Sequence, residues 1–430
     1  MEIQEYLNQK QELQEHLLRF IESGKDYQKE EKKDDKKEDK KDDKKDDKKG
    51  LKEDIKMINF LEIQKFREIR EIKEELQELL YLIAKISNNH RRNPAFFGKF
   101  EQILLHFEPD IKKNLTNSEI FNIFKINKRL LLFLIEKKFI EIDEGITNFI
   151  YRKSDTSYRL YFFPEIKEHL KKEDSESIEK ELRSQNQDYK SDTFLMKRKI
   201  GENDTFLCEL IRKDIVEDFI SHVNENNISL TSKIQPSLFE TNSFLLKKEP
   251  TIFEYSAFCG SLKIFQCLIT NNIEMTSSLW LYSIHGENNG LIHLLEENNV
   301  LPEDASYLKC LEEAIKCHHT EMAEHIMKKY VRKEEINHDT FYNNPLAYAF
   351  HFFNYKFISN DNKKFEFFYA CQFNYIKLVK LFLLTKEIYI NTKIILNHNF
   401  FLINQVSIIF FFNIIQCIQF FEWNFFSNFF

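Results

Sequence analysis

The fold is decided by the stretch YSAFCGSLKIFQCLI at residues 255–269, which returns as FYACQFNYIKLVKLF at residues 368–382. A third copy begins with LYSIHG at residues 281–286 and continues through Leu291, Leu294 and Leu295. Each copy has small residues in a first helical segment, then a glycine or asparagine, then an aliphatic second segment. Such self-similarity is the signature of a repeat protein, so the sequence predicts a row of helical hairpins.

The residue types at the repeated positions agree with this prediction. Small side chains let two antiparallel helices approach closely, and glycine or asparagine adopts the positive φ that a tight turn requires. The small residues are Ala257, Ser283 and Ala370, and the predicted turn residues are Gly260, Gly286 and Asn374. Residues 314–323 repeat the arrangement with His318 at the turn, and residues 344–349 begin a further hairpin.

These hairpins resemble ankyrin repeats. The opening TPLHxA of that class is similar to Asn344-Pro345-Leu346-Ala347-Tyr348-Ala349, and its later GHxEIVxLL is similar to the residues around Gly260, His318–Glu321 and Asn374–Leu381. The resemblance implies an all-α fold, with an α-solenoid of degenerate ankyrin-like helical hairpins over residues 204–395. It also implies partner binding on the concave surface and no catalytic residues.

A narrower resemblance covers most of residues 1–391. The irregular turns, the upstream helices and the segment YFFPEI at residues 161–166 look like a large protist family of ankyrin-like proteins that carry a domain of unknown function. The chain departs from the ankyrin consensus in its spacing, because Gly260 and Gly286 are 26 residues apart whereas Gly286 and His318 are 32 apart. Shortened fingers between some hairpins are expected as a result.

The residues before the repeats divide into three parts. Residues 1–24 have apolar side chains at helical spacing and predict an amphipathic helix. Residues 25–54 contain ten acids and ten lysines between Glu30 and Lys49, which predicts a solvated linker, with a frayed helix as the alternative. Residues 55–200 predict an irregular helical domain. Its first helix, over 55–86, is expected to pair with the helix over 3–21, with a coiled-coil dimer as the alternative.

Composition limits the classes of partner and the compartment. The net charge of -7 gives no overall basic field, which argues against nucleic acid as a partner. The acidic, amphipathic start lacks the features of a secretory signal, so we expect a cytoplasmic protein. Seven scattered cysteines contain no CxxC pair, and we expect reduced thiols rather than a disulfide framework.

Motifs for catalysis or cofactor binding are lacking in the sequence. The eight glycines never form a GxGxxG or GxxxxGK arrangement, which argues against nucleotide binding of those kinds. The run with the most potential ligands holds Cys310, Cys317, His318, His319 and His325, but it lacks two short-spaced ligand pairs, and the repeat alignment already accounts for Cys317, His318 and His325 as turn and core positions. We therefore predict no enzyme, no small-molecule substrate, no cofactor, and no catalytic or metal-binding residue.

The end of the chain has a different character. Residues 396–430 form an apolar tail, and eleven phenylalanines and a single charge, Glu422, fall between 400 and 430. A repeat array should end in a polar capping hairpin. Three readings remain open: a membrane anchor, an apolar last hairpin, and translated noncoding sequence, of which the monotony of Phe, Ile and Asn favours the last.

The sequence as a whole favours a non-catalytic protein–protein interaction module that binds a protein partner through the ankyrin-like repeat surface. The alternative is a membrane-tethered scaffold that is anchored by residues 400–430. The residues that contact the partner are not identified by the sequence, beyond the expectation that they lie at exposed first-helix and finger positions.

Overall fold

The stretch at residues 255–269 forms two helices joined by one tight turn in the computed structural model. The first is α17 (Ile252–Cys259), which begins with a capping box between Thr251 and Glu254. The second is α18 (Leu262–Thr270). Gly260 lies between them with φ +69°, so the predicted turn residue and its positive φ are confirmed.

The structure describes residues 2–23, 68–153, 156–185, 187–303, 305–336, 344–358 and 363–385. Within these ranges every regular element is a helix, and the β-type pairing is limited to an isolated bridge between Lys233 and Thr251. The all-α prediction is therefore confirmed. Among the described helices, none is both long enough and apolar enough to cross a lipid bilayer. The predicted linker at 25–54 and the tail at 396–430 lie outside the described residues.

The helices fall into an upstream group and a hairpin group. The upstream helices are α1 (Glu2–Glu22), α4 (Glu68–Glu71), α5 (Lys73–Asn89), α6 (Phe96–His106), α7 (Glu108–Asn114), α8 (Asn117–Phe124), α9 (Lys128–Glu136), α10 (Glu144–Arg152), α11 (Thr156–Tyr161), α12 (Phe163–Ile166), η2 (Lys167–His169), α13 (Lys172–Ser184) and α14 (Asp192–Ile200). The hairpin group adds α15 (Phe206–Lys213), α16 (Val216–Glu225), η3 (Leu245–Lys247), α19 (Leu279–Gly286), α20 (Asn289–Glu297), α21 (Leu308–Lys316), α22 (Thr320–Lys329), η4 (Lys333–Glu335), α23 (Pro345–Phe352), η5 (Tyr355–Phe357), α24 (Lys363–Gln372) and α25 (Ile376–Leu384) to α17 and α18.

The first helices of successive hairpins pack against one another in chain order. Contacts run from α15 to α17, α19, α21, α23 and α24, and the second helices α16, α18 and α20 also pack in order. Each first helix is followed within two residues by a residue with positive φ: Asp214, Gly260, Glu287, His318, Phe353 and Asn374. The hairpin that begins with α23 is irregular, because the short 3₁₀ turn η5 follows it in place of a full second helix.

Gly286 does not have the role that its sequence position predicts. The positive φ at this turn belongs to Glu287, and Gly286 is the last residue of α19. A Cβ at Gly286 would overlap the carbonyl oxygen of Ala257 and lie 2.9 Å from the backbone nitrogen of Gly260. The prediction of a turn glycine was therefore wrong here, and the glycine instead permits close packing of α19 on α17.

A hydrogen bond recurs between neighbouring hairpins. In four hairpins the donor is the side chain of the residue directly after the positive-φ turn residue. The acceptor is a main-chain carbonyl in the preceding hairpin, and it lies three residues before the positive-φ residue of that preceding hairpin. The pairs are Ser261 Oγ with Ile211 O at 2.5 Å, His319 Nδ1 with Ile284 O at 2.8 Å, Asn354 Nδ2 with Ile315 O at 2.8 Å, and Tyr375 OH with Phe350 O at 2.9 Å. This bond fixes the offset between adjacent hairpins.

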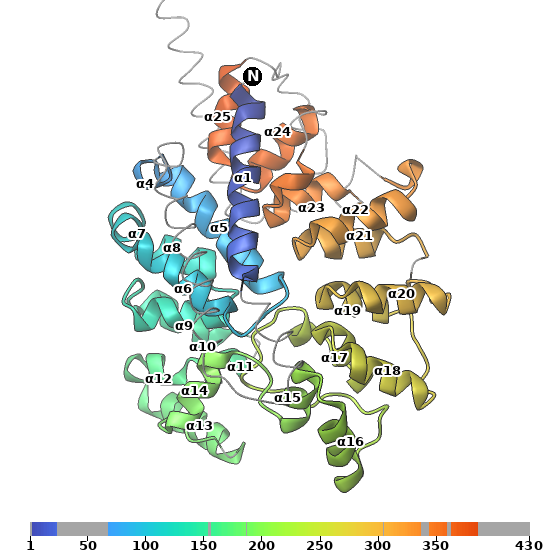
Figure 1. Ribbon diagram of the computed structural model, residues 1–430. Coiled ribbons are helices and arrows are strands. Elements are labelled where there is room, and N and C mark those ends of the chain that lie inside the picture. The colour runs from blue at the N-terminus through green and yellow to red at the C-terminus, as the bar shows by residue number, and fades with distance from the viewer. Residues whose placement is uncertain are drawn as a thin grey trace, which may run out of the picture.

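The upstream helices lead into the hairpin group at α14–α15 and contact it again through α1 and α5. Figure 1 shows the chain descending on the left from α5 to α12–α14, crossing at the bottom through α15 and α16, and rising on the right through α17, α19 and α21, while α1 stands between the two sides. Helix α1 contacts α6, η5 and α25. The larger of two hydrophobic clusters includes residues of both α1 and α25, so the two groups of helices share a core, while a smaller cluster is formed by α11–α14 with Phe239.

The predicted pairing of the helix over 3–21 with the helix over 55–86 is seen in its described part. Tyr6 OH donates to Glu78 Oε2 at 2.5 Å, and Lys10 pairs with Glu75. Residues 55–67 lie outside the described residues, and the rest is not one continuous helix because Ile72 is extended, with φ −108° and ψ 118°. Local periodicity could not predict this break, which separates α4 from α5.

Asn354 connects α1 to the hairpins and provides a test of this junction. Its amide donates to Ile315 O at 2.8 Å and accepts from Gln14 Nε2 at 2.9 Å. We expect Asn354→Ala to lower the free energy of unfolding by about 2 kcal/mol, because it leaves buried polar groups without partners. Asn298→Ala removes an exposed bond to Leu294 O within its own helix and should change stability by less than about 0.5 kcal/mol. Urea denaturation measures both, and equal losses would contradict the prediction.

Candidate binding groove

A cavity of about 370 Å³ lies where the first helices of three hairpins meet the segments that precede them. The helices are α17, α19 and α21, and the preceding segments come from residues 233–251, 277–278 and 302–303. Its lining residues are Lys233, Phe244, Lys248, Glu249, Thr251, Glu254, Ser277, Ser278, Leu281, Tyr282, Pro302, Glu303, Lys309 and Cys310. We call this cavity the groove.

The apolar part of the groove is formed by aromatic and aliphatic side chains. Phe244 and Tyr282 are buried and stack edge to face with ring centroids 5.0 Å apart, while Leu281 is partly exposed. Burial, followed by the nearby Glu254, raises the pKa of Tyr282. Its phenol therefore stays protonated near neutral pH and can donate a hydrogen bond.

The polar part of the groove contains a hydrogen-bonded carboxylate, Glu254, and two ion pairs at the rim. Glu254 is already satisfied, because it accepts from Ser278 Oγ at 2.6 Å and from the backbone nitrogen of Thr251 at 2.8 Å. Two ion pairs lie at the rim, Lys233 with Glu249 at 2.8 Å and Lys309 with Glu303 at 3.7 Å. The hydrogen bond from Lys233 lowers the pKa of Glu249, which keeps that carboxylate charged.

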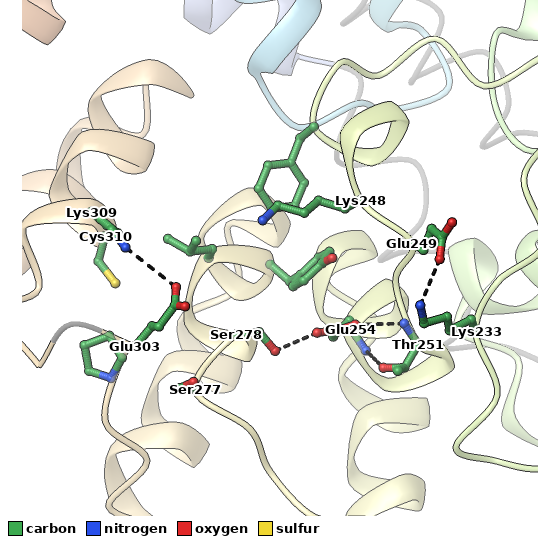
Figure 2. Close-up of a pocket in the computed structure, with 14 residues that line it drawn as sticks. Lys233, Lys248, Glu249, Thr251, Glu254, Ser277, Ser278, Glu303, Lys309 and Cys310 are labelled. Carbon is green, nitrogen blue, oxygen red and sulfur yellow. Dashed lines mark hydrogen bonds and ion pairs between the residues drawn. The ribbon is translucent and has the colours of Figure 1, made fainter. Parts of the chain in front are cut away.

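Lys248 differs from the other cations of the groove. Figure 2 shows it between the two rim ion pairs. It is exposed, and in the described part of the chain its ammonium has no carboxylate within ion-pair distance. The groove thus combines an apolar floor with one unpaired cation, an arrangement suited to contact with another molecule.

The ligand-rich run found in the sequence is not brought together as one site. Cys310 lines the groove, whereas the Cys317 sulfur lies 3.4 Å from Nδ1 of His285. His318 contacts Gln14 and the carbonyl of Phe352, His319 lies near His90 and Glu287, and His325 lies 3.2 Å from Glu296. No histidine lines the groove beside Cys310, so the lining residues offer no thiol–imidazole pair for nucleophilic catalysis.

The sequence contained a signal for the groove that hairpin periodicity alone did not reveal. Three second helices end in a pair of asparagines followed by Ile or Val, at residues 226–228, 271–273 and 298–300. The second asparagine of each pair has positive φ: 50° at Asn227, 58° at Asn272 and 52° at Asn299. These turns send the chain toward the segments that line the groove.

Comparison of the chain with family models, curated proteins and solved structures finds no match at any of the three levels.

Proposed function

We propose that residues 204–395 form a degenerate ankyrin-like α-solenoid and that the protein is a non-catalytic protein–protein interaction module of the cytoplasm. Three observations support the solenoid: the ordered packing of the first helices, the positive φ that follows each, and the recurring hydrogen bond between hairpins. Solenoids of this kind bind partners on the extended surfaces that stacking creates.

The groove is the observation that carries the binding proposal. It lies along three first helices and the segments before them, which agrees with the expectation that partner contacts fall at exposed first-helix and finger positions. The partner segment that fits it has an apolar side chain for the floor beside Phe244 and Leu281, and a carboxylate for Lys248. The turn side of the array, in contrast, is covered by the chain itself, since His90 bonds to Cys317 O at 2.8 Å and the Arg91 guanidinium lies against the turn at Gly260.

A photo-crosslinking residue at position 281 tests the location of binding. We expect it to form an adduct with one protein partner from the native cytosol, while the same residue at His293, on the second helix α20 and 65% exposed in its side chain, gives none. Adducts of equal yield from the two positions, or from neither in well-folded protein, would contradict the groove as the binding surface.

Lys248→Glu tests the charge of the partner once it has been captured. The exposed side chain makes no ion pair within the described residues, so the fold should be unaffected. We expect about 1 kcal/mol of lost binding energy, roughly a fivefold rise in Kd, and a weaker dependence on salt. Lys263→Glu, on the exposed face of α18, is the matched control and should leave Kd unchanged. If Lys248→Glu and Lys263→Glu raised the Kd equally, the partner would be responding to the net charge of the protein alone.

A further inference from the structure

Two buried histidines from distant parts of the chain meet where α1, the segment after α5 and the turns of two hairpins converge. His90 follows α5 and is 1% exposed, and His319 follows the turn after α21 and is 2% exposed. Their ring centroids are 4.9 Å apart. Glu287, from the turn after α19, completes a group whose ligand atoms all lie within 4.8 Å of one another.

The hydrogen bonds of the two histidines orient the same nitrogen of each ring toward this group. Nδ1 of His90 lies 2.8 Å from Cys317 O, and Nδ1 of His319 lies 2.8 Å from Ile284 O. A carbonyl oxygen only accepts, so each Nδ1 carries the proton and each Nε2 presents its lone pair when the ring is neutral. Metal-binding histidines are characteristically held in this way by a backbone carbonyl.

Each Nε2 faces a carboxylate. His90 Nε2 lies 3.1 Å from Glu22 Oε1, at the end of α1, and His319 Nε2 lies 3.9 Å from Glu287 Oε1. Ligands around a tetrahedral zinc ion are roughly 3.3 Å apart, as follows from metal–ligand bonds of about 2.0–2.1 Å. The two distances bracket this separation. The side chains of Glu22 and Glu287 are 33% and 25% exposed, which leaves a route for an ion from solvent.

The orientation of the two rings distinguishes this group from an ordinary ion-pair cluster. With each Nδ1 bonded to a carbonyl, both Nε2 lone pairs are directed at carboxylates, and a cation between them makes both contacts favourable. We therefore propose that His90, Glu287 and His319 form a binding site for Zn²⁺. Glu22, which contacts His90, would be drawn in as the fourth ligand and so tie α1 to the hairpins. Two imidazole nitrogens and two carboxylate oxygens are suitable ligands for that ion.

A second group of potential ligands nearby is less suitable. His285, Glu313 and Cys317 also lie within 4.8 Å of one another. However, Lys316 Nζ lies 2.7 Å from Glu313, and Glu313 is already bonded to His285 Nε2 at 2.5 Å. A metal ion there would have to displace or oppose the lysine ammonium. This group serves as an internal control for the proposed site.

Titration of the chelator-treated full chain with Co²⁺ tests the proposal, because Co²⁺ reports its coordination through visible d–d absorption. We expect one equivalent to give the intense bands of four- or five-coordinate Co²⁺, Zn²⁺ to abolish them by displacement, and Zn²⁺ to raise Tm. Absence of these bands in folded protein, or octahedral bands alone, would overturn the proposal.

Variants assign the ligands. Glu287→Gln and His319→Gln should weaken Co²⁺ binding by more than the roughly 10–100-fold that loss of an outer-shell partner costs. Glu287→Gln changes a partly exposed side chain and keeps its shape, so it serves if His319→Gln fails to fold. The controls His285→Gln, in the second group, and His325→Gln, on α22, should leave the affinity unchanged. Unchanged affinity in Glu287→Gln, or equal losses in a control, would show that the metal binds elsewhere.

Discussion

Lys10→Met should lower the free energy of unfolding by about 3–5 kcal/mol, the range for removal of one partner from a buried ion pair. Lys10 pairs with Glu75 and, at 2.9 Å, with Glu78, and the exposed fractions of the three side chains are 5%, 5% and 2%. Methionine fills a similar volume but leaves two buried carboxylates with Lys377, 2.6 Å from Glu75, as their one remaining cation among the described residues, while Glu78 keeps the hydrogen bond from Tyr6 OH. Chemical denaturation monitored by circular dichroism measures the loss.

The matched control for Lys10→Met is Lys112→Met. Lys112 pairs with Glu108 at 2.6 Å, but both side chains are more than a third exposed, at 42% and 35% for Lys112 and Glu108 respectively. Exposed pairs contribute about 0–1 kcal/mol, so this substitution should have little effect. If Lys10→Met were no more destabilising than Lys112→Met, α1 would not be held in the position that the structure gives it.

The loss in Lys10→Met should also depend on pH. Burial raises the pKa of Glu78, whereas Glu75, despite the opposing effect of burial, has its pKa lowered by Lys10 and Lys377. Removing Lys10 raises the pKa values of both Glu75 and Glu78 in the folded state. A carboxyl whose pKa is higher in the folded state than in the unfolded state favours folding at low pH and loses that contribution as pH rises. The loss of unfolding free energy in Lys10→Met, relative to the parent chain, should therefore be largest near neutral pH and should shrink as the carboxyls become protonated.

Gly286→Ala should lower the free energy of unfolding by about 3 kcal/mol, at the upper end of the usual cost of overpacking. The new Cβ would overlap the carbonyl of Ala257 and approach the backbone of Gly260. Backbone atoms cannot move aside as a flexible side chain can, so α17 and α19 would have to separate. Thermal unfolding of the full chain measures the change in Tm.

Gly98→Ala provides the control for Gly286→Ala. Gly98 lies within α6 and is exposed, and a Cβ there would have nothing within 4 Å. Alanine is favoured over glycine inside a helix by roughly 0.5–1 kcal/mol, so this variant should be slightly more stable than the parent chain. A similar rise in Tm for Gly286→Ala would mean that the two helices do not approach closely.

The helices of the hairpins were predictable because their signals are local. Small residues such as Ala257 and Ala370, and turn residues such as Gly260 and His318, identify a hairpin from a few neighbouring positions. The role of Gly286 was not predictable in this way, since glycine serves equally for a positive φ and for close packing. The position of α1 depends on pairs such as Gln14 and Tyr355, whose bond at 2.7 Å joins residues 341 apart in sequence.

The groove and the proposed zinc site were less predictable than the helices, because their residues come from distant parts of the chain. The sequence drew attention to Cys310, Cys317 and His319 because they are close along the chain, yet the structure gives each a different set of neighbours. His90 follows α5 directly, and nothing in its local sequence connects it to His319. Lys248 lies in a long segment before α17 that the hairpin pattern does not describe.

The contacts of α1 have a consequence for how this protein should unfold. An open row of repeats behaves nearly as a one-dimensional system, in which each unit is stabilised by its immediate neighbours and the ends fray first. Here α1 packs on η5 and α25, among the last of the described helices, so these helices are not free to melt alone. We expect amide exchange protection in α25 to follow that of α5, which would make the molecule a single cooperative unit rather than a row of separable ones.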